Sequence, residues 1–149
     1  MQTFEGDLIR PLGLLTLYAA YAEGELDELL ESISRDEPYD DTKRQWTIGR
    51  KLKYAIRVAR SFGANDLTEL VRVLNSGKVL FEKRNTLVHG KLFAGGRLVS
   101  NRRACPDQAV SPEKITELAE SLFSWKEQLW LRRCKDVLPY LKKANESGT

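Results

Sequence analysis

The chain has 149 residues, of which 42% are hydrophobic and 30% are charged. This length favours one domain with one core over residues 1–149, and the composition excludes a disordered or membrane-embedded chain. The N-terminal stretch is acidic and has no basic region ahead of an apolar run, so it does not resemble a secretory signal and we expect a cytoplasmic protein.

The net charge of +3 is divided unevenly along the chain. Residues 1–42 hold 11 acidic against 2 basic side chains, whereas residues 43–149 hold 22 basic against 10 acidic ones. Such a division is typical of a protein with a basic face for nucleic acid and an acidic face for another partner. Ordinary solvated helix faces explain it equally well.

The first segment has the period of an amphipathic helix. Pro11 suits a first helical turn, so we expect the regular helix to begin near it. Glu23, Asp27 and Glu31 lie off the apolar seam, which predicts an acidic face turned to water or to a partner. The seam itself consists of apolar residues at alternating spacings of four and three: Leu8, Leu12, Leu15, Ala19, Ala22, Leu26, Leu29 and Ile33.

Pro38 and the acidic residues around it predict a loop over residues 35–43. A second helix follows and ends near Gly63. Trp46 and Tyr54 could stack bases, although core or interface anchors are the commoner use of such aromatics. The seam of this helix is Ile48, Leu52, Ala55, Ala59 and Phe62. The cations expected on its remaining surface are Arg44, Arg50, Lys51, Lys53, Arg57 and Arg60; we predict RNA contacts at Arg44, Arg50, Lys53 and Arg57.

A short helix over residues 67–74 is predicted to break at residues 75–77, and a further helix to run from Lys78 to His89. Residues 91–108 lack a helical period and predict a β-hairpin that turns at Gly95 and Gly96. Arg97, Arg102 and Arg103 make this segment basic and are candidate RNA contacts.

Ser111 begins the last helix, which Pro139 ends or kinks. The pattern predicts an all-α, single-domain helical bundle of four to five helices, with a basic hairpin-like loop before the last helix.

The stretch around His89, the one histidine of the chain, carries the distinctive chemistry. On a helix, Asn85 and His89 share a face, and Arg84 lies about 100° away from Asn85. The last helical turn favours the protonated imidazole. An arginine, a proton shuttle and an amide suit phosphodiester chemistry. Cys105 and Cys134 are too isolated for a disulfide framework or a zinc site, so no metal or cofactor is expected.

Arg84-Asn85-Thr86-Leu87-Val88-His89-Gly90 resembles the signature of the HEPN family (higher eukaryotes and prokaryotes nucleotide-binding domains). That signature is an arginine, then a polar residue, with a histidine four to six residues beyond the arginine.

The resemblance implies a helical bundle that pairs as a homodimer and a metal-independent endoribonuclease. Catalysis would fall to Arg84 and His89, supported by Asn85, and cleavage by the RNA 2′-hydroxyl would leave a 2′,3′-cyclic phosphate. It also implies a toxin or phage-defence effector, held off by an antitoxin or a nucleotidyltransferase partner.

Two alternatives stay open at this point. The domain could bind RNA, nucleotides or a protein without cleaving anything. Arg84 and His89 could also merely cap a helix or pair with the acidic first helix. If the chain is a nuclease, one histidine has to serve two proton transfers, which predicts an active site shared across a two-fold dimer.

Overall fold

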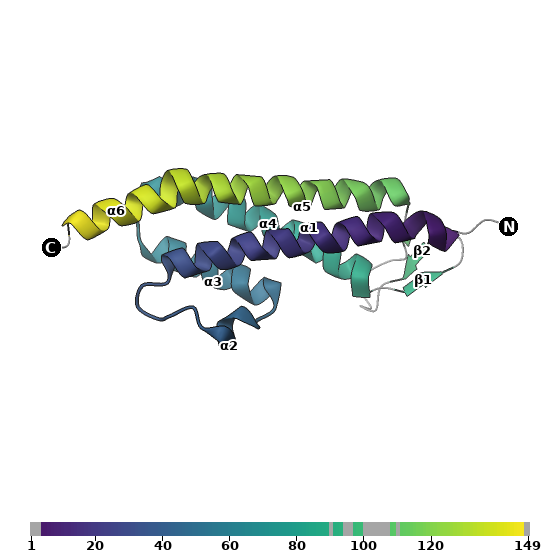
Figure 1. Ribbon diagram of the computed structural model, residues 1–149, viewed down its shortest axis with the longest axis horizontal. Helices are drawn as coiled ribbons and strands as arrows, with labels where there is room; N and C mark the ends of the chain where they lie inside the picture. The colour runs from purple at the N-terminus through teal and green to yellow at the C-terminus, as the bar shows by residue number, and fades with distance from the viewer. Residues whose placement is uncertain (1–3, 90, 94–96, 100–107, 110, 148–149) are drawn as a thin grey trace.

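A computed structural model describes residues 4–89, 91–93, 97–99, 108–109 and 111–147, with side chains over residues 8–88 and 111–147. Four helices form a bundle with a small sheet at one end (Figure 1). They are α1 (Phe4–Ile33), α3 (Ile48–Ser61), α4 (Thr68–His89) and α5 (Pro112–Arg132). The predicted all-α bundle is confirmed.

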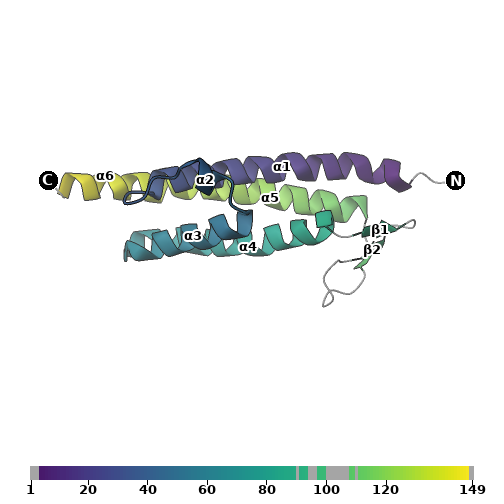
Figure 2. The same ribbon diagram turned by 90° about the horizontal axis from the view of Figure 1, so that it is seen from below.

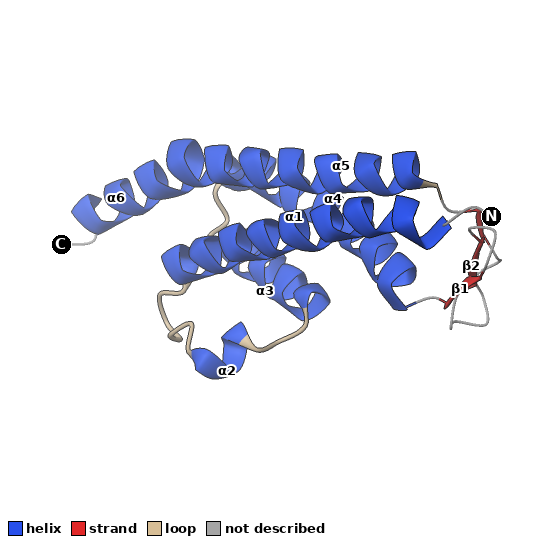
Figure 3. Ribbon diagram, turned by 45° about the vertical axis from the view of Figure 1, so that its right-hand side comes forward, coloured by secondary structure: helices blue, strands red, loops and turns tan. Residues whose placement is uncertain are grey.

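Helix α5 lies beside α1, and the two run in the same direction, with the first turns of α1 extending beyond the start of α5 (Figures 1 and 3). Helix α4 runs the opposite way and packs against both α3 and α5. The predicted seam of α1 is buried, apart from Leu12, which is partly covered. The predicted start near Pro11 is wrong, because α1 begins at Phe4 and contains Pro11. Leu8 and Leu15 both enter the core, so packing on each side holds the helix through the proline.

The segment before α3 is more ordered than predicted. A short helix, α2 (Asp41–Arg44), lies within the expected loop, and the side chain of Asp40 caps it by accepting a hydrogen bond from the Lys43 backbone N–H. Thr47 caps α3 in the same way, at 3.3 Å from the Arg50 backbone nitrogen. Gly63 follows α3 with a φ of +63°, as glycine commonly does after a helix.

Helix α4 is continuous where a break was predicted. It runs from Thr68 to His89 straight through Gly77, after a short 3₁₀ turn, η1 (Asn65–Leu67). A Cβ atom on Gly77 would lie 2.5 Å from Cζ2 of Trp125, so glycine is present to let α5 approach α4. The Trp125 indole also donates a hydrogen bond of 2.7 Å to the Val73 carbonyl. This tertiary contact keeps a helix where the local sequence favours a turn.

The predicted hairpin is confirmed by strands β1 (Lys91–Phe93) and β2 (Arg97–Val99), which pair antiparallel with Phe93 opposite Arg97. A third strand, β3 (Gln108–Ala109), was not predicted and pairs with the other edge of β2. The predicted turn residues Gly95 and Gly96 lie outside the described residues.

Helix α5 begins as predicted, with Ser111 capping it through a hydrogen bond from the Lys114 backbone N–H. It continues through a π-helical segment, η2 (Arg133–Val137), into α6 (Leu138–Ser147). Pro139 therefore lies in the first turn of α6, directly after the wider π-helical turn η2, and does not end the helix. No helix among the described residues is long and apolar enough to cross a membrane.

Candidate functional site

Arg84 lies on the stripe of α4 that faces the core, at the point where the core ends. Gly77 and Phe81 are buried on this stripe, and Arg84 and Val88 continue it toward the end of the helix. Arg84 is only half-buried, and Val88 is 48% exposed. The motif therefore begins where the bundle stops enclosing α4.

The guanidinium of Arg84 has no anionic partner in the described part of the chain. Its Cζ lies 5.8 Å from the centre of the Phe81 ring, and its Nε is buried without a hydrogen-bond partner. No ion pair of Arg84 occurs among the described side chains. The alternative in which Arg84 pairs with α1 is therefore not seen there. A buried donor with no acceptor costs about 1–3 kcal/mol, and an anion recovers this cost once the Arg84 side chain turns Nε outward to meet it.

Asn85 and His89 occupy the last turns of the same helix. Asn85 is half-buried, and α4 ends at His89, whose side chain lies outside the described residues, as does Gly90. The spacing places both residues on one helix face, as predicted. Phe81, three residues before Arg84, was not among the predicted site residues. Its spacing of one helical turn from the arginine was the signal that could have identified it.

The end of α4 that carries the motif extends beyond α3. In Figure 2, α3 lies beside the first part of α4, and the end of α4 leads directly to β1 and β2. Three arginines of residues 91–108 were predicted to contact RNA. Arg97 lies in β2, and Arg102 and Arg103 lie outside the described residues. The hairpin thus adjoins the motif, whereas the cations of α3 lie toward the other end of α4.

Trp46, which lies just before α3, and Tyr54 within α3 are anchors and not open platforms for bases. Tyr54 is buried and meets the Trp46 ring at right angles, with 5.3 Å between ring centres. The Arg50 guanidinium lies 4.0 Å above Trp46, and that of Arg57 lies 5.2 Å above Tyr54. Together with Lys53, these two arginines are exposed, so the cations remain available to phosphates although the rings do not.

Two predicted surface cations are engaged within the molecule. Lys51 is 1% exposed, and its Nζ lies 2.7 Å from Glu23 and 2.9 Å from Asp27. Burial lowers the pKa of Lys51, but the hydrogen bonds to these two carboxylates outweigh burial and raise it. Arg44 lies 2.9 Å from Glu31, and this hydrogen bond raises the pKa of Arg44.

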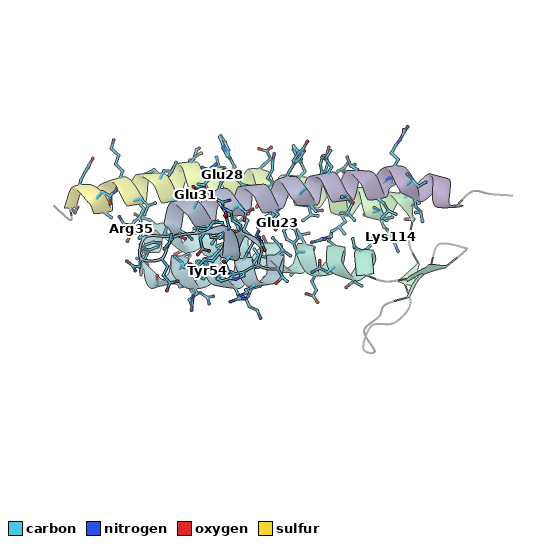
Figure 4. All side chains as sticks on the ribbon, turned by 60° about the horizontal axis from the view of Figure 1, so that its bottom comes forward. Glu23, Glu28, Glu31, Arg35, Tyr54 and Lys114 are labelled. Atoms are coloured by element: carbon cyan, nitrogen blue, oxygen red, sulfur yellow. The ribbon has the colours of Figure 1, made fainter. Side chains whose placement is uncertain are left out.

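The prediction that Glu23 and Asp27 face water or a partner is consequently wrong. Both carboxylates face α3, where they compensate a buried lysine, and Figure 4 shows Glu23 and Glu31 on α1 close to the α2–α3 segment. Tyr39 completes the cluster by donating a hydrogen bond to Asp27. Two of the 11 acidic side chains of residues 1–42 are therefore paired with Lys51 inside the bundle.

The described residues contain no group of His, Cys, Asp and Glu side chains arranged to hold a metal. Cys134 is a half-buried free thiol, and Cys105 lies outside the described part of the chain. Comparison of the chain with family models, curated proteins and solved structures finds no match. The resemblance to the HEPN family consequently depends on the motif at the end of α4.

Proposed function

We propose that this chain is an endoribonuclease that cleaves RNA without a metal, with Arg84 and His89 as catalytic residues and Asn85 as a supporting residue. The observation that carries the proposal is the guanidinium of Arg84, which has a buried donor without an acceptor. A planar guanidinium in this state suits an incoming phosphate, because two of its N–H groups match two phosphate oxygens.

The chemistry needs only the groups that the motif provides. The RNA 2′-oxygen attacks the adjacent phosphorus, the bond to the 5′-oxygen breaks, and the products are a 2′,3′-cyclic phosphate and a 5′-hydroxyl. Arg84 neutralises the charge that develops on the phosphate. His89, the last residue of α4, transfers a proton as general acid or base. Asn85 shares the helix face of His89 and orients the reacting groups.

The RNA path follows from the exposed cations. A strand lying along α4 would meet Arg50, Lys53 and Arg57 at one end and the hairpin with Arg97 at the other. Such an enzyme in the cytoplasm would act as a toxin or phage-defence effector, kept inactive by an antitoxin or a nucleotidyltransferase partner. The exposed cations suit a polyanionic strand, and the proposed attack by a 2′-hydroxyl requires that strand to be RNA.

The test is cleavage of mixed cellular RNA in excess EDTA, with analysis of the product ends. We expect cyclic phosphate ends from the wild type, and a loss of about 10²-fold or more in Arg84→Ala and His89→Ala. Arg72→Ala is the matched control, because Arg72 is an exposed arginine of the same helix that pairs with Glu69.

Cleavage that stops in EDTA or leaves 3′-hydroxyl ends would overturn the mechanism. Binding of RNA without cleavage would show a non-catalytic binding module. The shared active site has its own test, which mixes Arg84→Ala chains with His89→Ala chains. Activity recovered on mixing requires Arg84 of one chain to act with His89 of another.

A further inference from the structure

Helix α1 has an apolar face on the side opposite the core. Between Arg10 and Glu23, no residue of α1 is charged. The seam on one side is buried, yet Leu17 and Tyr21 on the other side are 45% and 49% exposed. A helix segment that is apolar all round is normally covered on all sides. No described segment of the chain therefore covers the outer side of α1.

Packing among the described residues does not require the two glycines on this outer side. Gly13 and Gly24 are spaced to share a stripe with Leu17 and Tyr21, and a Cβ atom on either would meet nothing within 4 Å. Gly77 differs, because Trp125 occupies the place of its missing side chain. Glycine weakens a helix relative to alanine, so two of them on an exposed face suggest that another backbone comes close.

Helix α5 extends this surface with two aromatic side chains, one of which lies under a lysine: the Nζ of Lys126 is 4.2 Å from the centre of the Phe123 ring. Phe123 packs against Tyr18 with 4.8 Å between ring centres, and Trp130 is 47% exposed. We name Leu17, Tyr21, Phe123 and Trp130 the α1/α5 face. It is about 27 Å long from residue 10 to residue 28 and about 20 Å wide, since neighbouring helices lie about 10 Å apart. Its projected area is therefore roughly 540 Å². The accessible area of a surface with protruding side chains is larger than its projection. The comparison value is the accessible area that a specific interface buries, about 800 Å² per partner.

We propose that the α1/α5 face binds a second copy of this chain, with the two α1 helices antiparallel across a two-fold axis near residue 19. The charges at the ends of the stripe support this partner. Arg10 and Glu28 are equidistant from residue 19 and share the stripe, and neither forms an ion pair among the described side chains. Antiparallel pairing places Arg10 opposite the Glu28 of the second copy and Leu17 opposite its Tyr21. The α1/α5 face is thus self-complementary in charge under the two-fold axis.

This contact has a consequence for the motif. The α1/α5 face lies on the opposite side of α1 from the buried seam, and so away from α4. A dimer formed through it keeps the two copies of Arg84 apart. A shared active site would need a further contact at the open end of α4. The inference is independent of the proposed nuclease, because it depends on neither Arg84 nor His89.

Sedimentation velocity of the full chain over a range of micromolar concentrations tests the proposal. We expect a dimer for the wild type and a monomer for Leu17→Lys. Val79→Lys is the matched control, because Val79 is 57% exposed on α4, outside the face, and that variant should stay dimeric. Far-UV circular dichroism should show the same helix content in all three proteins.

Charge exchange tests the antiparallel arrangement. Arg10→Glu and Glu28→Arg should each raise the dimer dissociation constant about ten-fold, since two symmetric contacts become repulsive. The two changes combined should restore the wild-type value. A wild type that is monomeric throughout, a dimer that survives Leu17→Lys, or a double variant no tighter than the single ones would each overturn the proposal.

Discussion

Replacing Gly77 by alanine tests the closest approach between two helices of the bundle. The added Cβ atom would lie 2.5 Å from Cζ2 of Trp125 and 2.8 Å from its Nε1, well inside van der Waals contact. Trp125 is 2% exposed and meets the Phe81 ring edge-on, with 5.6 Å between ring centres. The indole therefore has no space to move into, and moving it would break its hydrogen bond to the Val73 carbonyl.

The expected loss of stability is the balance of three effects. Alanine favours a helix over glycine by about 1 kcal/mol. Overpacking of a core costs about 1–3 kcal/mol, and loss of the buried Trp125 hydrogen bond costs about 1–3 kcal/mol. We expect Gly77→Ala to lower the free energy of unfolding by about 2–3 kcal/mol, which lowers the melting temperature by about 4–12 °C in a chain of this size.

Thermal and urea unfolding followed by far-UV circular dichroism measures this loss. Gly49→Ala is the control, because a Cβ on that exposed residue of α3 meets nothing within 4 Å and should leave stability unchanged or slightly higher. Adding Trp125→Phe to Gly77→Ala should relieve the overlap, so the double variant should lose less than the sum of the two single losses. A Gly77→Ala chain at least as stable as the wild type would refute the reasoning.

Three further outcomes follow from the site and its surroundings. Lys51→Met should lower the free energy of unfolding by about 2–3 kcal/mol in urea titrations. This loss is smaller than the usual cost of breaking a buried ion pair, because Asp27 has 22% of its side chain exposed and still reaches water. Burial and the hydrogen bond to Asp27 raise the pKa of Tyr39 above its ordinary 10.0, so the folded chain keeps a proton that the unfolded chain loses, and stability should fall as the pH rises above 10. Tyr39→Phe should flatten that fall in melts between pH 9 and 12; an equally steep fall would exclude this source. Reversing Lys53 and Arg57 to glutamate should weaken RNA binding and reduce its salt dependence, whereas an unchanged affinity would show that these cations do not meet phosphates.

The sequence was sufficient where one signal decided the structure. The seam of α1 from Leu8 to Ile33 depends only on helical period, and the start of α5 depends on the capping geometry of Ser111. Both predictions are confirmed because no distant residue competes with the local signal.

The sequence was insufficient where a distant side chain overrides a local preference. Asparagine, serine and glycine at residues 75–77 favour a turn, but Trp125, far along the chain, keeps them helical. Lys51 resembles its exposed neighbours on α3, and only the position of α1 shows that it is buried between Glu23 and Asp27. For the same reason, the motif could be found from its spacing, whereas the buried, unpartnered Nε of Arg84 could not.

The pairing of α1 with α5 also determines the order in which the chain can fold. The main partner of the first helix is encoded by residues 112–132, and the ion pair between Glu25 and Arg133 joins residues 108 positions apart. During synthesis α1 therefore leaves the ribosome with both of its sides apolar, and its main partner α5 is made only after most of the chain. Helices α3 and α4 are neighbours in sequence and can associate earlier. Nascent chains that stop before α5 should thus be the species most prone to aggregate and most dependent on chaperones.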